Sequence, residues 1–130
     1  MRREKPIRYE LSYKMTGVLF AAHNELGRFR GERQYADAIE KYLKLYGIGH
    51  ERERVLPVSF DGESSGRNKV DFLIEDKIIV EVKEKRILGK DDYYQTKRYL
   101  VSLGKKLGIL VNFRDKFLKP RRVLNSLAKE

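Results

Sequence analysis

The sequence predicts an α/β fold in which helices flank a mixed four-stranded sheet, with elements in the order α-α-β-β-β-α-β. Three observations lead to this prediction. Two segments with helical periodicity come first, three extended segments separated by turn residues follow, and a further helical segment precedes a last, almost wholly apolar strand. A helix that connects two strands of one sheet makes those strands parallel, beside an antiparallel meander. The 130 residues suit one compact domain, without linkers or internal repeats.

The two N-terminal helices are predicted from apolar residues that recur every three or four positions. In residues 11–26 these are Leu11, Met15, Val18, Leu19 and Leu26, and in residues 32–46 they are Tyr35, Ala36, Ile39, Leu43 and Tyr46. Gly27 and Gly31 interrupt the pattern between the two segments, and Gly47 and Gly49 follow the second. We therefore expect two helices joined by a short loop.

The sheet is predicted from extended segments separated by turns. These segments are residues 51–60, 69–75, 78–84 and 107–113, with the turns "DGESSGRN" and "DK" between the first three. The last segment is nearly all apolar, so we expect it in the interior of the sheet. The helix after residue 90 should begin with Asp91 or Asp92 as its N-cap and stop at Gly104. The core is expected over about residues 11–113, and the one regular element considered for the basic tail, 114–130, is a short terminal helix.

The composition favours a polyanionic partner. The chain has 29 Lys and Arg against 19 Asp and Glu, a formal net charge of +10, which suits nucleic acid or an acidic membrane surface; a merely solvated basic surface is the alternative. The absence of cysteine excludes disulfides, thiolate zinc sites and cysteine nucleophiles. The first ten residues lack the apolar core of a signal peptide, and no stretch approaches the roughly 18 apolar residues of a membrane span. We therefore expect a soluble cytoplasmic protein with no membrane partner.

The segment "VDFLIEDKIIVEVKEK", residues 70–85, places charged residues on a strand that otherwise belongs inside a sheet. Because strand side chains alternate between faces, Glu81 and Lys83 share a face, and the hairpin brings Asp71 opposite residue 81. Two carboxylates so close repel each other, and a divalent cation relieves the repulsion. Oxygen ligands without cysteine or clustered histidine favour Mg²⁺ or Mn²⁺. Lys83 is then placed to orient an attacking water or to stabilise charge that develops on a phosphate.

Structural roles are the alternative for these residues. Asp71 at a strand end would pair with an arginine, and Glu81 and Lys83 would form a salt bridge on an exposed face. The apolar residues that flank Glu81 argue against such exposure. His23 and His50 lie far apart, without the spacing of metal ligands, so we expect structural or surface roles for both.

The arrangement D-x₉-E-V-K, formed by Asp71 and by Glu81, Val82 and Lys83, resembles the motif of the PD-(D/E)XK nuclease superfamily. The usual proline before the aspartate is absent, and Val70 stands there. The order of elements, with a helix, a three-stranded meander, a crossover helix and a strand, is also similar to that superfamily. The resemblance implies a restriction-endonuclease-like core and a metal-dependent phosphodiesterase.

Further segments are similar to the narrower GxxExxY family, over about residues 11–122: "LSYKMTGVLFAAHNELG", "ERQYADAI", "DKIIVEVKE", "QTKRYL" and "LGILVNF". Glu32 and Tyr35 keep the E-x-x-Y part of the motif, whereas Phe29 replaces the glycine three residues before the glutamate. The resemblance implies that the first core helix presents Glu32 to the metal site. It also implies that the crossover helix presents Gln95 there.

The candidate catalytic residues are therefore Asp71, Glu81, Lys83, Glu32 and Gln95. The candidate metal ligands are Asp71, Glu81, Glu32 and the backbone carbonyl of Val82. Glu32 falls on the apolar stripe of its helix, so we expect it to point inward; the alternative is an acid in the first helical turn, stabilised by the helix dipole. For Gln95 the alternative is a half-buried amide bonded to backbone.

These residues predict a nuclease that uses Mg²⁺ or Mn²⁺ to hydrolyse phosphodiester bonds in DNA or RNA, with DNA the expected partner. The residues expected to hold flanking phosphates, and so to make affinity fall with salt, are Lys85, Arg86, Arg98, Lys105, Arg121 and Arg122. Tyr93 and Tyr94 would stack on bases or, alternatively, belong to the core and its rim. The alternatives for the whole protein are a catalytically inactive nucleic-acid-binding module of this fold, a Holliday-junction resolvase, and a small partner-binding protein. A homodimer would suit a small nuclease that acts on both strands.

Overall fold

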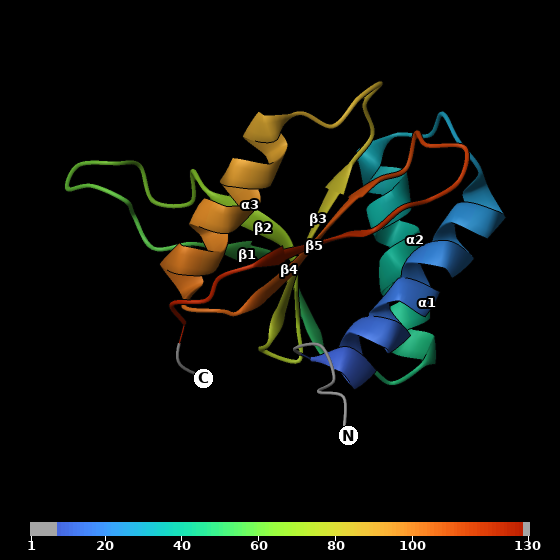
Figure 1. Cartoon of the computed structure of the whole chain (residues 1–130), viewed down its shortest axis with the longest axis horizontal. Helices are drawn as coiled ribbons and strands as arrows, with labels where there is room; N and C mark the ends of the chain where they lie inside the picture. The colour runs from blue at the N-terminus through green and yellow to red at the C-terminus, as the bar shows by residue number, and fades with distance from the viewer. Residues whose placement is uncertain (1–7, 129–130) are drawn as a thin grey trace, which may run out of the picture.

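The computed structural model describes residues 8–128, which form three helices and a five-stranded sheet (Figure 1). In chain order the elements are α1 (Tyr9–Leu26), α2 (Glu32–Leu45), β1 (His50–Val55), β2 (Lys69–Ile74), β3 (Ile78–Lys83), α3 (Lys90–Leu103), β4 (Leu107–Asn112) and β5 (Arg121–Leu124). The strands lie in the order β1-β2-β3-β4-β5. β3 and β4 are parallel because α3 connects them across one face, and the other neighbouring strands of the described chain are antiparallel. The predicted mixed sheet with flanking helices is confirmed.

The helices cover both faces of the sheet. α1 and α2 lie on one face and α3 lies on the other (Figure 1). Side chains that alternate along β2 and β3 divide between these layers, so that Phe72 and Val80 pack under α1 and α2. Leu73 and Ile79 pack under α3. Burial on both faces explains why the inner strands are continuous apolar runs. Within residues 8–128, no helix is both long and apolar enough to cross a membrane.

The C-terminal tail contributes a fifth strand that was not predicted. β5 pairs antiparallel with β4, from Leu107↔Leu124 to Leu110↔Arg121. The expectation of a four-stranded sheet is therefore wrong, and the short helix considered for the tail does not form in its described part. Only Val123 of β5 is buried, so this strand has too few apolar residues to show the alternation that identifies strands. It pairs with backbone N–H and C=O groups of β4 that would otherwise lack partners.

The boundaries of β1 and of the start of α3 differ from the prediction. β1 ends at Val55, and residues 56–68 form a long loop that extends beyond the sheet (Figure 1, green). The N-cap of α3 is Gly89 rather than an aspartate. Asp92 acts from inside the first turn instead, because its Oδ2 accepts a hydrogen bond from the Gly89 N–H (2.9 Å). Gly104 ends α3 in the left-handed conformation (φ 67°), as predicted.

Candidate active site

β2 and β3 cease to pair where the charged residues begin. Their pairing ends at Phe72↔Val80, and continuing the same register places Asp71 opposite Glu81. At this point the Asp71 side chain replaces a strand partner, since its Oδ2 accepts a hydrogen bond from the Val82 N–H (2.7 Å). The hairpin alignment expected from the sequence therefore brings the two carboxylates together.

Glu81 is the buried member of this pair. It is 3 % exposed, and its Oε1 is buried without a hydrogen-bond partner among the described residues. Burial, together with charge repulsion and hydrogen bonding from Asp71, raises the pKa of Glu81 from 4.5 to about 9. Within residues 8–128 no arginine pairs with either carboxylate, and the burial of Glu81 excludes a salt bridge on an exposed face. A buried oxygen without a partner marks a place where a cation or a water is expected.

Lys83, at the end of β3, approaches α3. Its Nζ donates to Oε1 of Gln95 at 3.5 Å, and both side chains are half-buried. Tyr99 follows Gln95 by one helical turn, and burial together with the carboxylates Glu81 and Asp71 raises the pKa of its hydroxyl. α3 thus covers the carboxylate pair on one side. Tyr99 was not predicted for this site, although its spacing from Gln95 was the available signal.

Toward α2, Asp71 and Val82 line an open cavity of about 280 Å³. Glu32, the first residue of α2, lines the same cavity. It is exposed, so the prediction that it points inward is wrong, because the first turn of α2 borders a cavity rather than packed core. Glu53 of β1 also lines the cavity, with a left-handed φ of 54°, and was not predicted. Across residues 8–128, no group of three or more His, Cys, Asp or Glu side chains converges closely enough to hold a metal ion.

Asn112, the last residue of β4, ties together the loops beside Lys83. It is 1 % exposed and is the register partner of Lys83. Its Oδ1 accepts from the Lys85 N–H (3.0 Å) and its Nδ2 donates to the Lys85 C=O (2.7 Å). Oδ1 also accepts from the Arg114 N–H (3.3 Å). Asn112 was not predicted, although a single amide near the end of the apolar segment "LGILVNF" was a visible signal.

The arginines predicted to hold flanking phosphates have different placements. Arg86 and Arg121 line one cavity. Arg98 is exposed on α3. Arg122 donates from Nη1 to Oγ of Ser12 (3.0 Å), beside α1.

The two lysines of the same set form ion pairs. Lys85 pairs with Asp92 (3.0 Å) and Lys105 pairs with Asp76 (3.2 Å). Asp76 belongs to the turn between β2 and β3, at the opposite end of β3 from Lys83. Five strand residues span roughly 16 Å, so Lys105 is not brought to the candidate site.

The aromatic and histidine side chains named from the sequence are placed as follows. Tyr93 packs against the core under α3, whereas Tyr94 is exposed. Nε2 of His23 contacts a backbone carbonyl oxygen, and Nε2 of His50 contacts the Glu40 carboxylate (2.9 Å). Neither histidine lines the cavity beside Asp71. These contacts agree with structural roles for both histidines.

The comparison with protein families identifies the superfamily. The family model of the PD-(D/E)XK nuclease superfamily matches residues 9–123, which is most of the chain. The chain belongs to this superfamily. Searches among curated proteins and among solved structures gave no match. The superfamily predicted from the D-x₉-E-V-K motif and its restriction-endonuclease-like fold are therefore confirmed. PD-(D/E)XK proteins are usually nucleases, which makes nucleic acid the expected class of substrate.

Proposed function

We propose that this PD-(D/E)XK protein is a nuclease that uses Mg²⁺ or Mn²⁺ to hydrolyse phosphodiester bonds in nucleic acid, with DNA the favoured substrate. The observation that carries the proposal is the buried Glu81 beside Asp71, with one oxygen that lacks a partner among the described residues. A buried carboxylate held beside a second, half-buried one is costly unless something binds them. A purely structural strand would gain stability from an apolar residue at position 81.

The oxygen atoms at this place fit a hard divalent cation. The carboxylates of Asp71 and Glu81 and the backbone carbonyl of Val82 would hold it, and such oxygen ligands are those that Mg²⁺ and Mn²⁺ prefer. Mg²⁺ commonly keeps several waters and takes one or two protein carboxylates, so a third converging carboxylate is not required. Glu32 and Glu53, which line the adjoining cavity, would contact those waters. The bound cation would polarise the scissile phosphate and lower the pKa of a water.

Lys83 would supply positive charge from the α3 side of the site. Its ammonium group would orient the attacking water and stabilise the negative charge that develops on the phosphate. Gln95 would act as a positioning residue, because its Oε1 accepts a hydrogen bond from the Lys83 Nζ (3.5 Å). A lysine at the end of a paired strand is held more rigidly than one on a loop, which favours this role.

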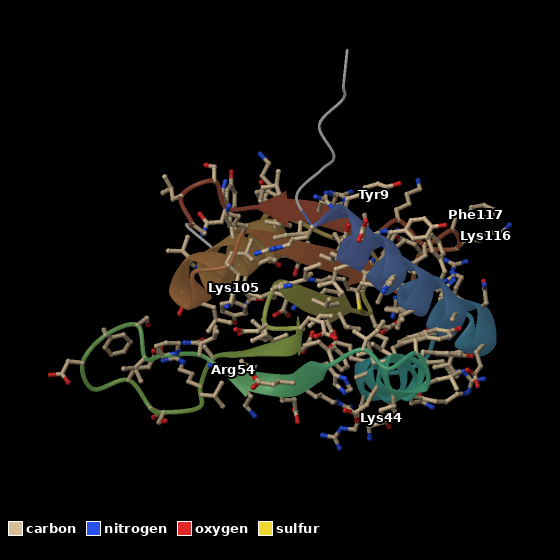
Figure 2. All side chains as sticks on the ribbon, turned by 90° about the horizontal axis from the view of Figure 1, so that it is seen from below. Tyr9, Lys44, Arg54, Lys105, Lys116 and Phe117 are labelled. Atoms are coloured by element: carbon tan, nitrogen blue, oxygen red, sulfur yellow. The ribbon has the colours of Figure 1, made fainter. Side chains whose placement is uncertain are left out.

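Cleavage assays test the proposal. The purified protein is incubated with single-stranded DNA, duplex DNA, a four-way DNA junction and RNA, in Mg²⁺ or Mn²⁺. Asp71→Asn, Glu81→Gln and Lys83→Ala should each lower cleavage by at least about a hundredfold, because each removes a charge next to the reacting phosphate. Lys44→Ala is the control, since it removes an exposed lysine near the end of α2 (Figure 2). Equal cleavage by wild type and the three site variants would refute the assignment.

A nucleic-acid-binding module that does not cut is the second candidate. The lack of a third converging carboxylate within residues 8–128 favours it. Calorimetry with Mn²⁺ distinguishes the two: metal binding that is lost in Glu81→Gln supports the enzyme. Nucleic-acid binding that needs no metal, in a protein that cuts none of the substrates, supports the module.

We also propose membership of the narrower GxxExxY family. Tyr35 supports it, because its hydroxyl closes the loop between α1 and α2. That hydroxyl donates to the Gly27 C=O (2.5 Å) and accepts from the Arg30 N–H (3.2 Å), while the ring stacks on Phe113 (4.3 Å between ring centres). Phe29 stands at the position of the family's glycine and has a φ of 66°, a conformation that glycine adopts without strain.

The oligomeric state and the cellular location remain predictions from the sequence. A homodimer would present two sites to the two strands of a duplex, and analytical ultracentrifugation measures whether it forms. Preferential cutting of the four-way junction would support a Holliday-junction resolvase. Fluorescence microscopy of the tagged protein tests the cytoplasmic location.

A further inference from the structure

A second cavity, of about 370 Å³, lies between the loops that follow β3 and β4. Residues 84–89 form one wall and residues 113–120 form the other. The hydrogen bonds of Asn112 to Lys85 and Arg114 join the two walls. β3 and β4 are parallel, so both loops begin at the same end of the sheet, beside Lys83. Adjacent strands lie about 4.8 Å apart, so this loop cavity begins one strand away from the candidate active site.

The loop cavity is strongly cationic. Its charged lining residues are Arg86, Lys116, Lys119 and Arg121, together with a single carboxylate, Asp115. Within the described part of the chain, none of these four cations forms an ion pair, whereas the nearby Lys85 and Arg114 pair with Asp92 and Glu84. Cations that are not neutralised and that surround an open space attract phosphate groups.

Two large apolar side chains, Phe117 and Ile87, border the same cavity. Phe117 and Ile87 are each 73 % exposed. Figure 2 shows Phe117 and Lys116 together at the edge of the molecule, and the Lys116 Nζ lies 5.6 Å from the centre of the Phe117 ring. An exposed aromatic ring among cations suits a nucleotide, because the base stacks on the ring while the cations bind the phosphates on either side. A base inside a duplex is already stacked and paired, so the ring would select an unpaired base.

We infer that the loop cavity binds an unpaired nucleotide of the substrate, next to the bond that is cut. The position next to the cut bond rests on the proposed nuclease function, whereas the binding itself does not. Phe117 is the stacking residue, and Arg121 and Lys119 hold the adjoining phosphates. The substrate class is nucleic acid with a single-stranded stretch, such as a free single strand, an overhang or a fork.

Binding measured without divalent metal separates recognition from cleavage. Fluorescence anisotropy in EDTA compares one labelled DNA oligonucleotide as a single strand and as a blunt duplex. Wild type should bind the single strand more tightly. Phe117→Ala should weaken single-strand binding by about fivefold to a hundredfold, the range expected for one base stack, and duplex binding by less than about twofold. Phe117→Trp should keep the preference for the single strand.

Matched variants separate stacking from general surface effects. Phe60→Ala removes a comparably exposed phenylalanine (56 %) from the loop between β1 and β2, and should bind like wild type. Lys119→Ala and Arg121→Ala should each lower the salt dependence of single-strand binding, by about 0.7 in the log–log slope for each lost phosphate contact. Thermal melting of Phe117→Ala should match wild type because the side chain is exposed. A lowered melting temperature would indicate a structural role and overturn the inference.

The remaining outcomes decide between the inference and the proposed function. Unchanged single-strand affinity in Phe117→Ala, an equal loss on both DNA forms, tighter wild-type binding of the duplex, or no binding at all would each overturn the inference. If wild type binds single strands through Phe117 but cuts nothing, the nuclease function fails and the inference stands. If wild type cuts nucleic acid and Phe117→Ala binds and cuts equally well, the inference fails and the nuclease function stands.

Discussion

The cavity beside Asp71 and the loop cavity beside Asn112 flank the same strand end but are built from different parts of the fold. Paired strands and the first turn of α2 border the first, next to the buried Glu81. Two connecting loops border the second, where Phe117 is exposed. The hydrogen-bonded pairing of strands fixes the positions of their side chains. Loops tolerate substitution and commonly carry the residues that bind a ligand. Under the proposed function, we expect from this difference that chemistry and substrate selection can be separated by variants.

The largest effect is expected from the titration of Glu81 in metal-free protein. Its pKa is about 9 in the folded state, against an ordinary value of 4.5 that applies to the unfolded chain. The folded state therefore binds the proton more tightly, and the stabilisation is fully present below pH 4.5 and lost as pH rises through about 9. The free energy of unfolding should fall over this range by at most about 1.4 kcal/mol per pH unit. Urea denaturation in EDTA at a series of pH values measures it.

Two variants identify the group responsible for this dependence. Glu81→Gln should remove most of the pH dependence and should leave the metal-free protein more stable than wild type at mildly alkaline pH. Glu32→Gln, which changes an exposed carboxylate of the neighbouring cavity, should keep the dependence. The explanation is wrong if wild-type stability is constant over this pH range, or if Glu81→Gln shows the same slope.

A somewhat smaller loss is expected at Asn112, which joins the walls of the loop cavity. Asn112→Ala leaves the N–H and C=O of Lys85 without the buried amide that bonds them, and each such loss costs about 1–3 kcal/mol. The free energy of unfolding should fall by about 2–4 kcal/mol. Single-strand binding should weaken as well, because the two walls are no longer held at a fixed separation. Urea denaturation and anisotropy measure the two effects.

Asn125 offers the matched control for that variant. It is also buried (5 %), and its Nδ2 donates to the Lys105 C=O (3.2 Å), at the end of β4 away from the candidate site. Asn125→Ala should therefore destabilise the fold without weakening single-strand binding beyond what partial unfolding explains. Equal losses of binding in Asn112→Ala and Asn125→Ala would show that Asn112 has no special relation to the loop cavity.

A still smaller effect is expected at Phe29, in the loop between α1 and α2. This residue has a φ of 66° and is 68 % exposed, with the Arg28 guanidinium 4.7 Å from its ring centre. Alanine and glycine both remove the ring, but only glycine relieves the left-handed strain, which costs about 1–2 kcal/mol. Phe29→Gly should therefore be more stable than Phe29→Ala by about 1 kcal/mol in urea denaturation, after the entropy of glycine is subtracted. A Phe29→Ala variant of equal stability would show that the backbone is not strained there.

The positions that follow from strand pairing were accessible to sequence analysis. Counting across the hairpin aligned Asp71 with Glu81, since an antiparallel register allows few alternatives once the turn is located. The apolar runs of β3 and β4 identified the inner strands for the same reason, because burial on both faces leaves a direct pattern in the sequence. Gln95 was assigned to the metal site from the family resemblance and not from any periodicity, and the structure places it beside Lys83.

What depended on tertiary contact could not be predicted. β5 buries Val123 alone, so it lacks a pattern, and the role of Asn112 depends on a loop that begins 27 residues earlier in the chain. Helical periodicity predicted that Glu32 points inward, because a periodic pattern identifies the inner face only where packed core lies against the helix. The first turn of α2 borders a cavity instead. Lys105 and Arg121 contribute equally to the net charge, although Arg121 lies near the candidate site and Lys105 does not.

The smallest effect is therefore expected at Lys105, whose Nζ lies 3.2 Å from Asp76 Oδ1. Figure 2 shows Lys105 and Phe117 on opposite sides of the molecule. Asp76 is 81 % exposed, so the ion pair contributes about 0–1 kcal/mol, and Lys105→Ala should change single-strand affinity by less than about twofold. Arg121→Ala, in contrast, should lower the salt slope by about 0.7. If Lys105→Ala lowers that slope as much as Arg121→Ala does, nucleic acid also contacts the far end of β3, and recognition is not confined to the loop cavity.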